Sequence, residues 1–170
     1  MNCNLNLIPP KIKKLLQLQK KIYQLKFLDP DCGNGNFLTE SFISFRRLEN
    51  KILRELLSGQ IKLGALDNPV KVSINQFFGI EINDFTCTVA RTALWIVELQ
   101  ILQETQEIIH QPLDFLPLKS YANIFEGNAL CLDWNKIAPQ VNFIMGTRPL
   151  SVRNTKLPPK KLTFSTFAKI

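Results

Sequence analysis

The feature that most constrains the fold is an alternation of short apolar segments with longer stretches of helical periodicity. The apolar segments are five to seven residues long and are each followed by a polar or glycine-containing turn, which predicts strands at 25–29, 76–82, 121–126 and 141–145. Helices are predicted over 11–24, 36–57 and 85–107. Strands that alternate with helices predict an α/β fold, here a partial Rossmann-like fold of about four parallel strands with flanking helices.

The apolar spacing also predicts which face of each helix is buried. In the first helix the predicted face contains Leu15, Leu18 and Ile22. In the second helix it is a stripe made of Phe37, Ser41, Phe45, Leu48 and Ile52. Asp84 is predicted to cap the third helix at its N-terminus.

Four polar turns follow the four predicted strands. They are Asp29 to Gly35, Glu81 to Asp84, Gly127 to Asn128, and the segment from Gly146 onward. Because parallel strands end at the same edge of a sheet, we expect these turns to lie side by side. Open α/β sheets bind their ligands at this edge, so the sequence predicts the functional site there.

The first turn has the sequence Asp-Pro-Asp-Cys-Gly-Asn-Gly-Asn, from Asp29 to Asn36. Gly33 and Gly35 can adopt backbone conformations closed to other residues and let the main chain approach a ligand. The free N–H groups of the following helix point to the same place. A carboxylate such as Asp29 repels phosphate and attracts an ammonium group. The turn therefore suits a ligand with an amine and a carboxylate better than a pyrophosphate.

Two further turns add a ribose partner and a base partner. Glu81 ends the second strand, where an acid commonly accepts hydrogen bonds from ribose hydroxyls. Asn128, in the third turn, suits an exocyclic amine or a ring nitrogen of a purine. An amino-acid end, a ribose and an adenine together describe S-adenosylmethionine (SAM).

Each of these residues also has a simpler interpretation. A glycine-x-glycine sequence is often an ordinary turn. Glu81 alone is compatible with a surface acid, Asn128 with a turn residue and Cys32 with a small residue in a crowded turn. The hypothesis depends on the order of these residues and on their placement after strands.

Charge is distributed unevenly along the chain. Residues 1–26 contain six lysines and residues 147–170 contain six Lys or Arg, with no acid in either, whereas 27–146 has a net charge of −5. Basic ends favour binding to nucleic-acid phosphates, and the alternative is a solvated basic helix with an unstructured tail. We accordingly divide the chain into a basic amphipathic helix (1–24), a body (25–146) and a basic, disordered tail (147–170).

Composition argues against several classes of protein. No run of about 18 uncharged apolar residues is present, so no membrane span is expected. Pro9 and Pro10 interrupt the apolar N-terminus, which argues against a secretory signal. The four cysteines form no CxxC pair and the single histidine, His110, has no cysteine nearby, so no metal site is expected. Widely spread cysteines fit a reduced, cytoplasmic setting.

Three motifs in order along the chain resemble those of a known family. Residues 28–38 (Leu-Asp-Pro-Asp-Cys-Gly-Asn-Gly-Asn-Phe-Leu) are similar to the SAM-binding motif of adenine-specific DNA methyltransferases. Residues 78–82 (Phe-Gly-Ile-Glu-Ile) and 90–95 (Ala-Arg-Thr-Ala-Leu-Trp) look like the second motif and its helix, and 127–134 looks like the third. The chain thus resembles class I SAM-dependent DNA (adenine-N6) methyltransferases over about 25–146, in particular the type IIG enzymes that fuse methylation with restriction.

The resemblance implies a role for each turn. Asp29, Gly33 and Gly35 would bind the methionine part of SAM, Glu81 would hold the ribose and Asn128 would lie near the adenine. The complete set of cofactor-binding residues that it implies is Asp29, Pro30, Cys32, Gly33, Gly35, Glu81, Ile82 and Asn128. It also implies double-stranded DNA as the partner, with neither a metal nor a membrane.

The catalytic motif departs from the family pattern. The family has Asn-Pro-Pro-Phe after the fourth strand, where the Asn side chain and a backbone carbonyl accept hydrogen bonds from the N6 amine of a flipped adenine and the Phe stacks on it. This chain has Thr147, Arg148, Pro149 and Leu150 there. Thr147 has no amide carbonyl, Arg148 brings a cation to a developing cation, and Leu150 cannot stack. No catalytic residue is intact, so we expect methyl transfer to be lost.

A single-base deletion explains this segment. Removing one adenine from codons for Asn-Pro-Pro-Phe-Val-Gly-Ala-Arg gives Thr-Arg-Pro-Leu-Ser-Val-Arg, which is the sequence of residues 147–153. The hypothesis puts 147–170 out of frame, and the alternative is a diverged motif in a genuine short protein. Compared with the family, the chain is expected to be truncated at both ends, with its fourth strand left as an unpaired edge.

Other functions stay open at the level of sequence. One is a non-catalytic module that binds SAM or nucleic acid, and another is a relic without function. A dinucleotide-dependent oxidoreductase is disfavoured, because Leu38 stands where the third glycine of GxGxxG belongs.

Overall fold

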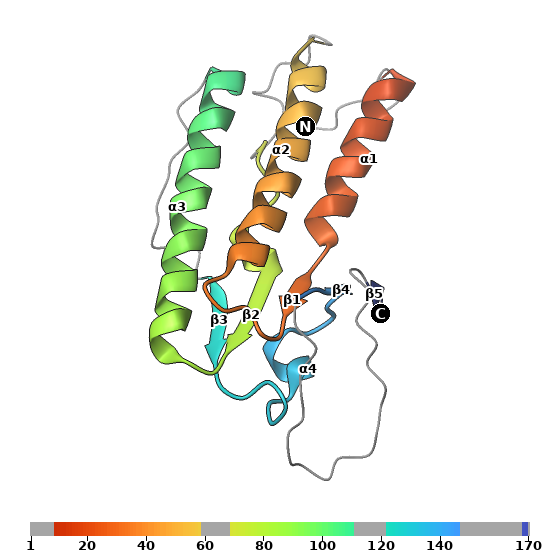
Figure 1. Ribbon diagram of the computed structural model, residues 1–170. Helices are drawn as coiled ribbons and strands as arrows, with labels where there is room; N and C mark the ends of the chain where they lie inside the picture. Colours follow the sequence, from red (N-terminus) through yellow and green to blue (C-terminus); the bar gives the residue numbers. More distant parts are fainter. Residues whose placement is uncertain (1–8, 59–68, 111–121, 147–167, 170) are drawn as a thin grey trace.

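The computed structural model describes residues 9–58, 69–110, 122–146 and 168–169. Along the chain its elements are α1 (Pro10–Gln24), β1 (Phe27–Asp29), α2 (Asn36–Ser58), the 3₁₀ helix η3 (Ile74–Gln76), β2 (Phe77–Glu81), α3 (Asp84–Ile109), β3 (Asn123–Glu126), α4 (Trp134–Ile137), β4 (Phe143–Ile144) and β5 (Ala168–Lys169). Figure 1 shows the three long helices standing side by side above the strands. The predicted α/β class, with its four strands and three long helices, is confirmed.

The sheet has the strand order β3-β2-β1-β4-β5. The first four strands are parallel, and Leu28 in the middle of β1 pairs with Phe78 on one side and Ile144 on the other. The expectation that β4 has an unpaired edge is wrong, because β5 pairs antiparallel with β4. β5 also places two residues of the predicted disordered tail in the sheet, and 147–167 lie outside the described residues.

The two faces of the sheet are covered by different elements. Alternate residues of a strand point to opposite faces, so Phe27 and Phe77 face the long helices while Leu28 and Phe78 face the other way. On the helical side, Phe27 stacks on Phe77 with ring centroids 5.0 Å apart, within the larger cluster of buried apolar residues. On the opposite side, Leu28 and Phe78 pack beneath the turn that contains α4. The long helices therefore share one face of the sheet.

The buried faces of the helices differ from the prediction. Leu18 of α1 is 39% exposed and Leu48 of α2 is 37% exposed, although both were expected to be buried. The buried residues of α2 are Leu38, Thr39, Phe42, Arg46, Glu49, Asn50, Ile52, Leu53 and Leu56. This face is rotated by about one residue from the predicted stripe, because it includes polar residues that an apolar pattern leaves out.

The start and the composition of α3 also differ from the prediction. Asn83 is its N-cap, with the side chain accepting a hydrogen bond from the N–H of Thr86, and Asp84 is the first helical residue. By length and composition alone, α3 is apolar enough to cross a membrane, and 22% of the relevant window is buried. One such helix is weak evidence for a membrane span, since the core helices of soluble proteins have the same properties. In this structure α3 packs against α2, β2 and β3. The expected absence of a membrane span therefore stays a prediction.

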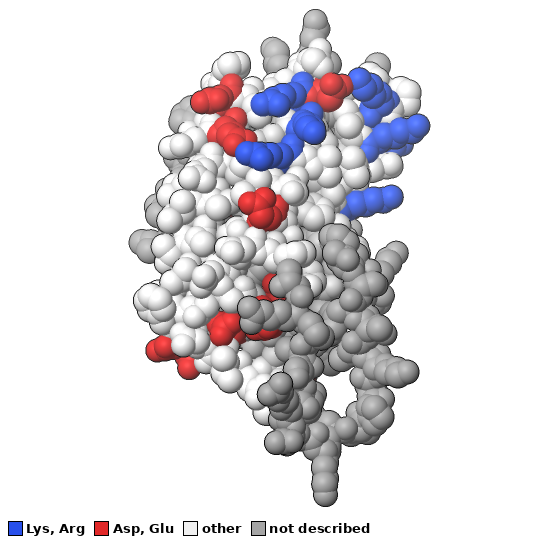
Figure 2. Space-filling model, in the orientation of Figure 1, with Lys and Arg blue, Asp and Glu red and all other residues white. Residues whose placement is uncertain are grey.

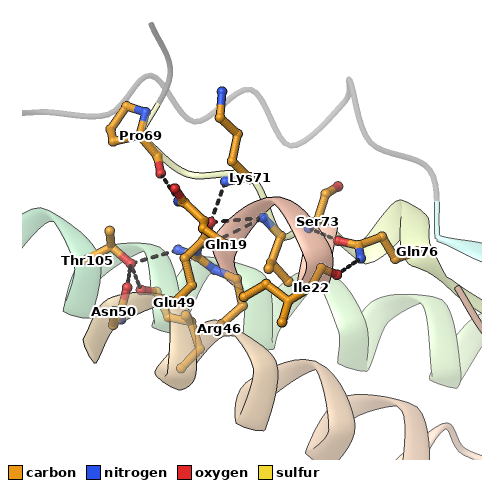
Figure 3. A network of polar contacts seen from close by, with 12 residues as sticks. Gln19, Ile22, Arg46, Glu49, Asn50, Pro69, Lys71, Ser73, Gln76 and Thr105 are labelled. Carbon is orange, nitrogen blue, oxygen red and sulfur yellow. Dashed lines mark hydrogen bonds and ion pairs between the residues drawn. The ribbon is translucent and has the colours of Figure 1, made fainter. Parts of the chain in front are cut away.

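A buried polar network connects α2 with α1 and with the segment that leads into β2 (Figure 3). Glu49 is completely buried and forms an ion pair with Arg46, which is 3% exposed. The Glu49 carboxylate also accepts hydrogen bonds from Gln19 Nε2 at 2.8 Å and from the backbone N–H of Lys71 at 2.7 Å. A second backbone donor, the N–H of Val72, lies 3.2 Å from Oε2. Every oxygen of this buried carboxylate is thus hydrogen-bonded.

Three further hydrogen bonds extend the network. Arg46 Nη2 donates to Thr105 Oγ1 on α3 at 2.7 Å. At the start of β2, Gln76 Nε2 donates to the carbonyls of Ile22 and Leu25, at 2.9 and 2.8 Å. These carbonyls lie at the end of α1, where the regular helical hydrogen bonds stop, and that of Ile22 also accepts from the N–H of Leu25 at 3.3 Å. The chain segments that enter β1 and β2 are therefore tied to each other and to α2.

Exposed cations gather on the same half of the molecule. Figure 2 shows Lys and Arg over the upper parts of α1 and α2. Two of them form exposed ion pairs, Lys11 with Glu55 at 2.7 Å and Arg47 with Glu104 at 3.4 Å. The basic helix of the sequence-based division is thus packed on the body, and its charge lies away from the ends of the strands that carry the predicted site.

Candidate cofactor site at the carboxyl ends of the strands

The turns after the first four strands lie at one edge of the sheet, as predicted. The N–H of Gly33 donates to Glu81 Oε2 at 3.1 Å, which joins the turns after β1 and β2. The N–H of Gly127 donates to the carbonyl of Glu81 at 2.8 Å, which joins the turns after β2 and β3. A β-carbon added to Gly146, just after β4, would lie 3.2 Å from Asp29 Oδ1. The predicted convergence of these turns is therefore confirmed.

Asp29 ends β1 in the middle of the sheet. Its side chain is buried, with the residue 2% exposed, and Oδ1 accepts a hydrogen bond from the N–H of Asp31 at 3.1 Å. Burial raises the pKa of the Asp29 carboxyl to about 6, and the negative charges of Asp31 and Glu81 add to this effect. A neighbouring cation would favour the ionised form. Asp29 is therefore a buried acid whose surroundings suit a positively charged ligand group.

The two glycines of the first turn have different roles. Gly33 has a φ of +51°, and a β-carbon built on it meets no atom within 4 Å, so the main chain here borders open space. Gly35 has a φ of +78°, and its β-carbon would lie 3.1 Å from the β-carbon of Ala90 on α3. Gly33 thus leaves room for a ligand, whereas Gly35 allows close packing between the turn and α3.

Pro30 and Cys32 are buried parts of the same turn. The N–H of Cys32 donates to the carbonyl of Ile80 at 3.0 Å, which holds the turn against β2. The Cys32 thiol lies against Gly79, where an added β-carbon would be 2.8 Å from Sγ. Burial, with a further contribution from the charge of Asp29, raises the pKa of the Cys32 thiol, so it stays protonated. The Cys32 side chain is part of the packing, as its simpler interpretation proposed.

Glu81 is half-buried at the end of β2, and Ile82 after it is 67% exposed. Besides the hydrogen bond from Gly33, the Glu81 carboxylate accepts one from the N–H of Asn83 at 3.0 Å. Ile82 is an apolar side chain at the edge of the site, next to an acceptor that can bind hydroxyl groups. This pair suits a ligand with a polar sugar and a flat apolar base.

Asn128 lies in the turn after β3, where Gly127 has a φ of +150°. It is exposed, and its Oδ1 accepts a hydrogen bond from the N–H of Leu130 at 3.0 Å. This local hydrogen bond is typical of an asparagine in a turn. The contacts of Asn128 are thus those of its simpler interpretation, and its side-chain N–H₂ group donates no hydrogen bond to the described residues.

Some parts of the predicted site lie beyond the described residues, and some residues were missed. Thr147, Arg148, Pro149 and Leu150 fall outside the described part of the chain. Gly79 was missed, although a lone glycine inside a strand indicates a close approach of another chain segment. Within the described ranges no group of three His, Cys, Asp or Glu residues is placed to hold a metal ion.

Comparisons with known proteins agree on one family. The model of the DNA-methyltransferase domain of MmeI matches residues 6–168. The chain belongs to this family. It is 38% identical over 127 residues to DNA methyltransferase A of Bacillus subtilis (strain 168), covering 74% of this chain and 14% of that protein.

A solved structure supports the same assignment. The type IIL restriction–modification enzyme MmeI, in complex with DNA, matches with a TM-score of 0.71 and 38% identity. The match covers 79% of this chain and 18% of the MmeI chain. The resemblance to DNA methyltransferases that are part of restriction–modification enzymes is therefore confirmed, and this chain spans less than a fifth of the length of the relatives it matches.

Proposed function

We propose that this chain is the SAM-binding part of a DNA (adenine-N6) methyltransferase of a restriction–modification system, and that it lacks methyl transfer by itself. The observation that carries the proposal is the meeting of Asp29, Gly33 and Glu81 at one edge of the sheet. A buried acid, an open stretch of main chain and a second carboxylate are the groups that an amino-acid nucleoside requires.

The described residues fit SAM by charge and by space. SAM carries an ammonium and a sulfonium. The site presents the carboxylates of Asp29, Asp31 and Glu81, and no cation of the described residues is hydrogen-bonded to them. The open space at Gly33 admits a ligand to the main chain. Asp29 would hold the ammonium, Glu81 the ribose hydroxyls, and Ile82 would pack against the adenine. When bound, SAM supplies an electrophilic methyl group on its sulfonium.

The residues of this chain bind and orient the ligand. Because the Asp29 carboxyl has a pKa of about 6, it is partly protonated in weakly acidic solution. An ammonium group beside it favours ionisation, so the proton leaves to solvent as the ligand binds. Glu81 can accept hydroxyl hydrogens on the lone pairs that its backbone N–H partners leave free. Binding should therefore weaken as the pH falls through 6.

Loss of transfer follows from the chemistry of the segment after β4. The N6 amine becomes positively charged during attack, and one missing acceptor typically costs about 10²–10³ in rate. Thr147, Arg148 and Leu150 replace the acceptor, the neutral surroundings and the stacking ring of the family motif. We expect a turnover too slow to measure against double-stranded DNA, which we propose as the partner of the whole enzyme.

Calorimetry and a transfer assay test the proposal together. SAM should bind the chain with a single site and should bind the Asp29→Asn variant at least tenfold more weakly, while labelled methyl should not appear in mixed-sequence DNA. Measurable transfer would show that catalysis survives. No SAM binding by the unaltered chain would reject the cofactor and favour a nucleic-acid-binding module or a relic. NAD, added as a control ligand, should not bind.

We further propose that a single-base deletion produced residues 147–170. The alternative, a diverged motif in frame, has support from the family match, which continues to residue 168. The nucleotide sequence of the gene distinguishes the two. One base restored at codon 147 should reveal Asn-Pro-Pro-Phe and a methyltransferase-like continuation, and its absence in all frames would exclude the deletion.

A further inference from the structure

Glu81 makes contacts with three of the four turns at the candidate site. Its Oε2 accepts the hydrogen bond from the N–H of Gly33 in the turn after β1. Its Oε1 accepts the one from the N–H of Asn83 at the start of α3. Its main-chain carbonyl accepts the one from Gly127 in the turn after β3. Among the residues predicted for the site, Glu81 is the one whose described hydrogen bonds reach all three turns.

The turn after β1 depends on such contacts for its shape. Gly33 has a left-handed φ, and no atom lies where its side chain would be, so one side of its main chain is open. The N–H of Cys32 holds this turn against β2 through its hydrogen bond to the Ile80 carbonyl. The next residue, Gly33, is held by the Glu81 carboxylate. A hydrogen bond to an ionised acceptor is about twice as strong as one between neutral groups.

The same carboxylate can hold the turns and bind a ligand at once. Each carboxylate oxygen has about two lone-pair positions, and each oxygen of Glu81 uses one for a backbone N–H. One position on each oxygen remains for a hydroxyl group. The backbone contacts therefore persist when a ligand arrives, and they fix where the free positions point.

We propose that Glu81 is a positioning residue that holds the glycine turn and the start of α3 in their binding arrangement before any ligand is present. This role is in addition to a contact with ribose, and its effect on affinity rests on the proposed SAM site. It predicts that a substitution of Glu81 lowers the affinity even for ligands that have no hydroxyl group for Glu81 to bind.

Hydrogen exchange tests the role without a ligand. The 170-residue chain would be compared with Glu81→Gln, which keeps one acceptor, and with Glu81→Asp, which keeps the charge but is shorter by one methylene. The amides of Gly33 and Asn83 should exchange about tenfold faster in both variants, while the amide of Leu28, which is completely buried in β1 between β2 and β4, keeps its rate and reports the fold. The matched control is Glu126→Gln, an exposed acid that pairs with Glu81 across β2 and β3, and it should change neither amide.

Unchanged exchange of Gly33 and Asn83, in a variant whose Leu28 amide is still protected, would overturn the proposal. So would equal acceleration by the Glu126 control. Global unfolding of one variant appears as loss of Leu28 protection, in which case the other variant decides.

A second experiment separates positioning from the ribose contact. S-adenosylhomocysteine and its 2′,3′-dideoxy analogue would be titrated into the unaltered chain and Glu81→Gln. The dideoxy analogue should lose about tenfold in affinity with the variant although it offers no hydroxyl to Glu81, and the parent nucleoside should lose more. Equal binding of the analogue to both proteins would overturn the proposal. If neither nucleoside binds the unaltered chain, the proposed cofactor is wrong, and the exchange rates still decide the role of Glu81.

Discussion

Among the residues that the structure describes, two carboxylates are almost completely buried, and their surroundings are opposite. Glu49, among the long helices, faces Arg46 and accepts hydrogen bonds from a glutamine side chain and two backbone N–H groups. Asp29, at the edge of the sheet, accepts one hydrogen bond from the described residues, that of the Asp31 N–H, and its neighbours Asp31 and Glu81 are acids. A buried charge is tolerated when it is paired and costs stability when it is not.

The difference separates structure from function. The Glu49 network is complete without a ligand and ties α1 and the start of β2 to α2. Asp29 is left with a raised pKa, which is the usual sign that a charged partner is missing, and perturbed pKa values gather at functional sites. Burial alone therefore does not mark a functional acid, whereas burial without a neighbouring cation does.

The largest effect should come from Glu49→Ala. It leaves the Arg46 guanidinium buried without its partner, and such a loss costs about 3–5 kcal/mol in the free energy of unfolding. Urea denaturation measures it. The control is Glu55→Ala, which breaks the exposed pair with Lys11 and should cost less than about 1 kcal/mol. Similar losses in the two variants would remove the distinction between the network and the surface.

Asp29→Asn should increase the stability of the protein, in contrast to Glu49→Ala. The pKa of Asp29 is about 6 in the folded state, above the ordinary aspartate value of 3.8, so the native state holds the proton more tightly and stability falls as the pH rises between these values. Asn removes this cost while still accepting the hydrogen bond from Asp31. The variant should be more stable by about 3 kcal/mol above pH 6 and no more stable below about pH 4. Denaturation at pH 7.5 and pH 3.5 checks this, and a loss of stability at pH 7.5 would contradict the comparison.

Gly79→Ala should have a smaller cost that reaches the site through packing. The added β-carbon would lie 2.7 Å from Ile124 Cδ1 and 2.8 Å from Cys32 Sγ, and overpacking of this kind costs about 1–3 kcal/mol. Because Cys32 belongs to the glycine turn, SAM affinity should fall as well. Thermal melting and calorimetry measure the two effects, and a variant with unchanged melting temperature would show that the turn can move freely.

The smallest change in stability is expected for Gly33→Ala. Alanine fits the open space there but is strained at a φ of +51°, which costs about 1 kcal/mol. The methyl group would occupy the space proposed for the ligand. The free energy of SAM binding should therefore fall by more than the free energy of unfolding. Unchanged SAM affinity would place the ligand elsewhere along the edge.

Much of the fold follows from local pattern. The predicted strands at 25–29 and 76–82 contain β1 and β2, and the predicted helix at 36–57 matches α2 within a residue at its C-terminal end, because apolar runs and turns are local signals. The meeting of the turns also follows, since parallel strands end together. η3, α4 and β5 were missed because each is shorter than the window in which periodicity can be recognised.

A pattern of hydrophobic residues does not predict the Glu49 network. Apolar periodicity gives Arg46 and Glu49 no reason to be inside, so the predicted stripe of α2 was rotated toward Leu48. A signal was present: Glu49 follows Phe42 by seven residues and precedes Ile52 by three, which puts it on an apolar face. The backbone partners of Glu49 are more than twenty residues away in sequence, and only the folded chain shows them.

Gly146 lies close to Asp29 because it comes just after β4 and Asp29 ends the neighbouring strand, β1. β4 and β1 are hydrogen-bonded neighbours, so the place where the chain leaves β4 is set by the sheet rather than by a loop. Any side chain at 146 would press on the acid proposed to hold the ammonium. Substitutions at this glycine should therefore be read first as changes in ligand selectivity, which makes position 146 a sensitive place to screen for altered use of methyl-donor analogues.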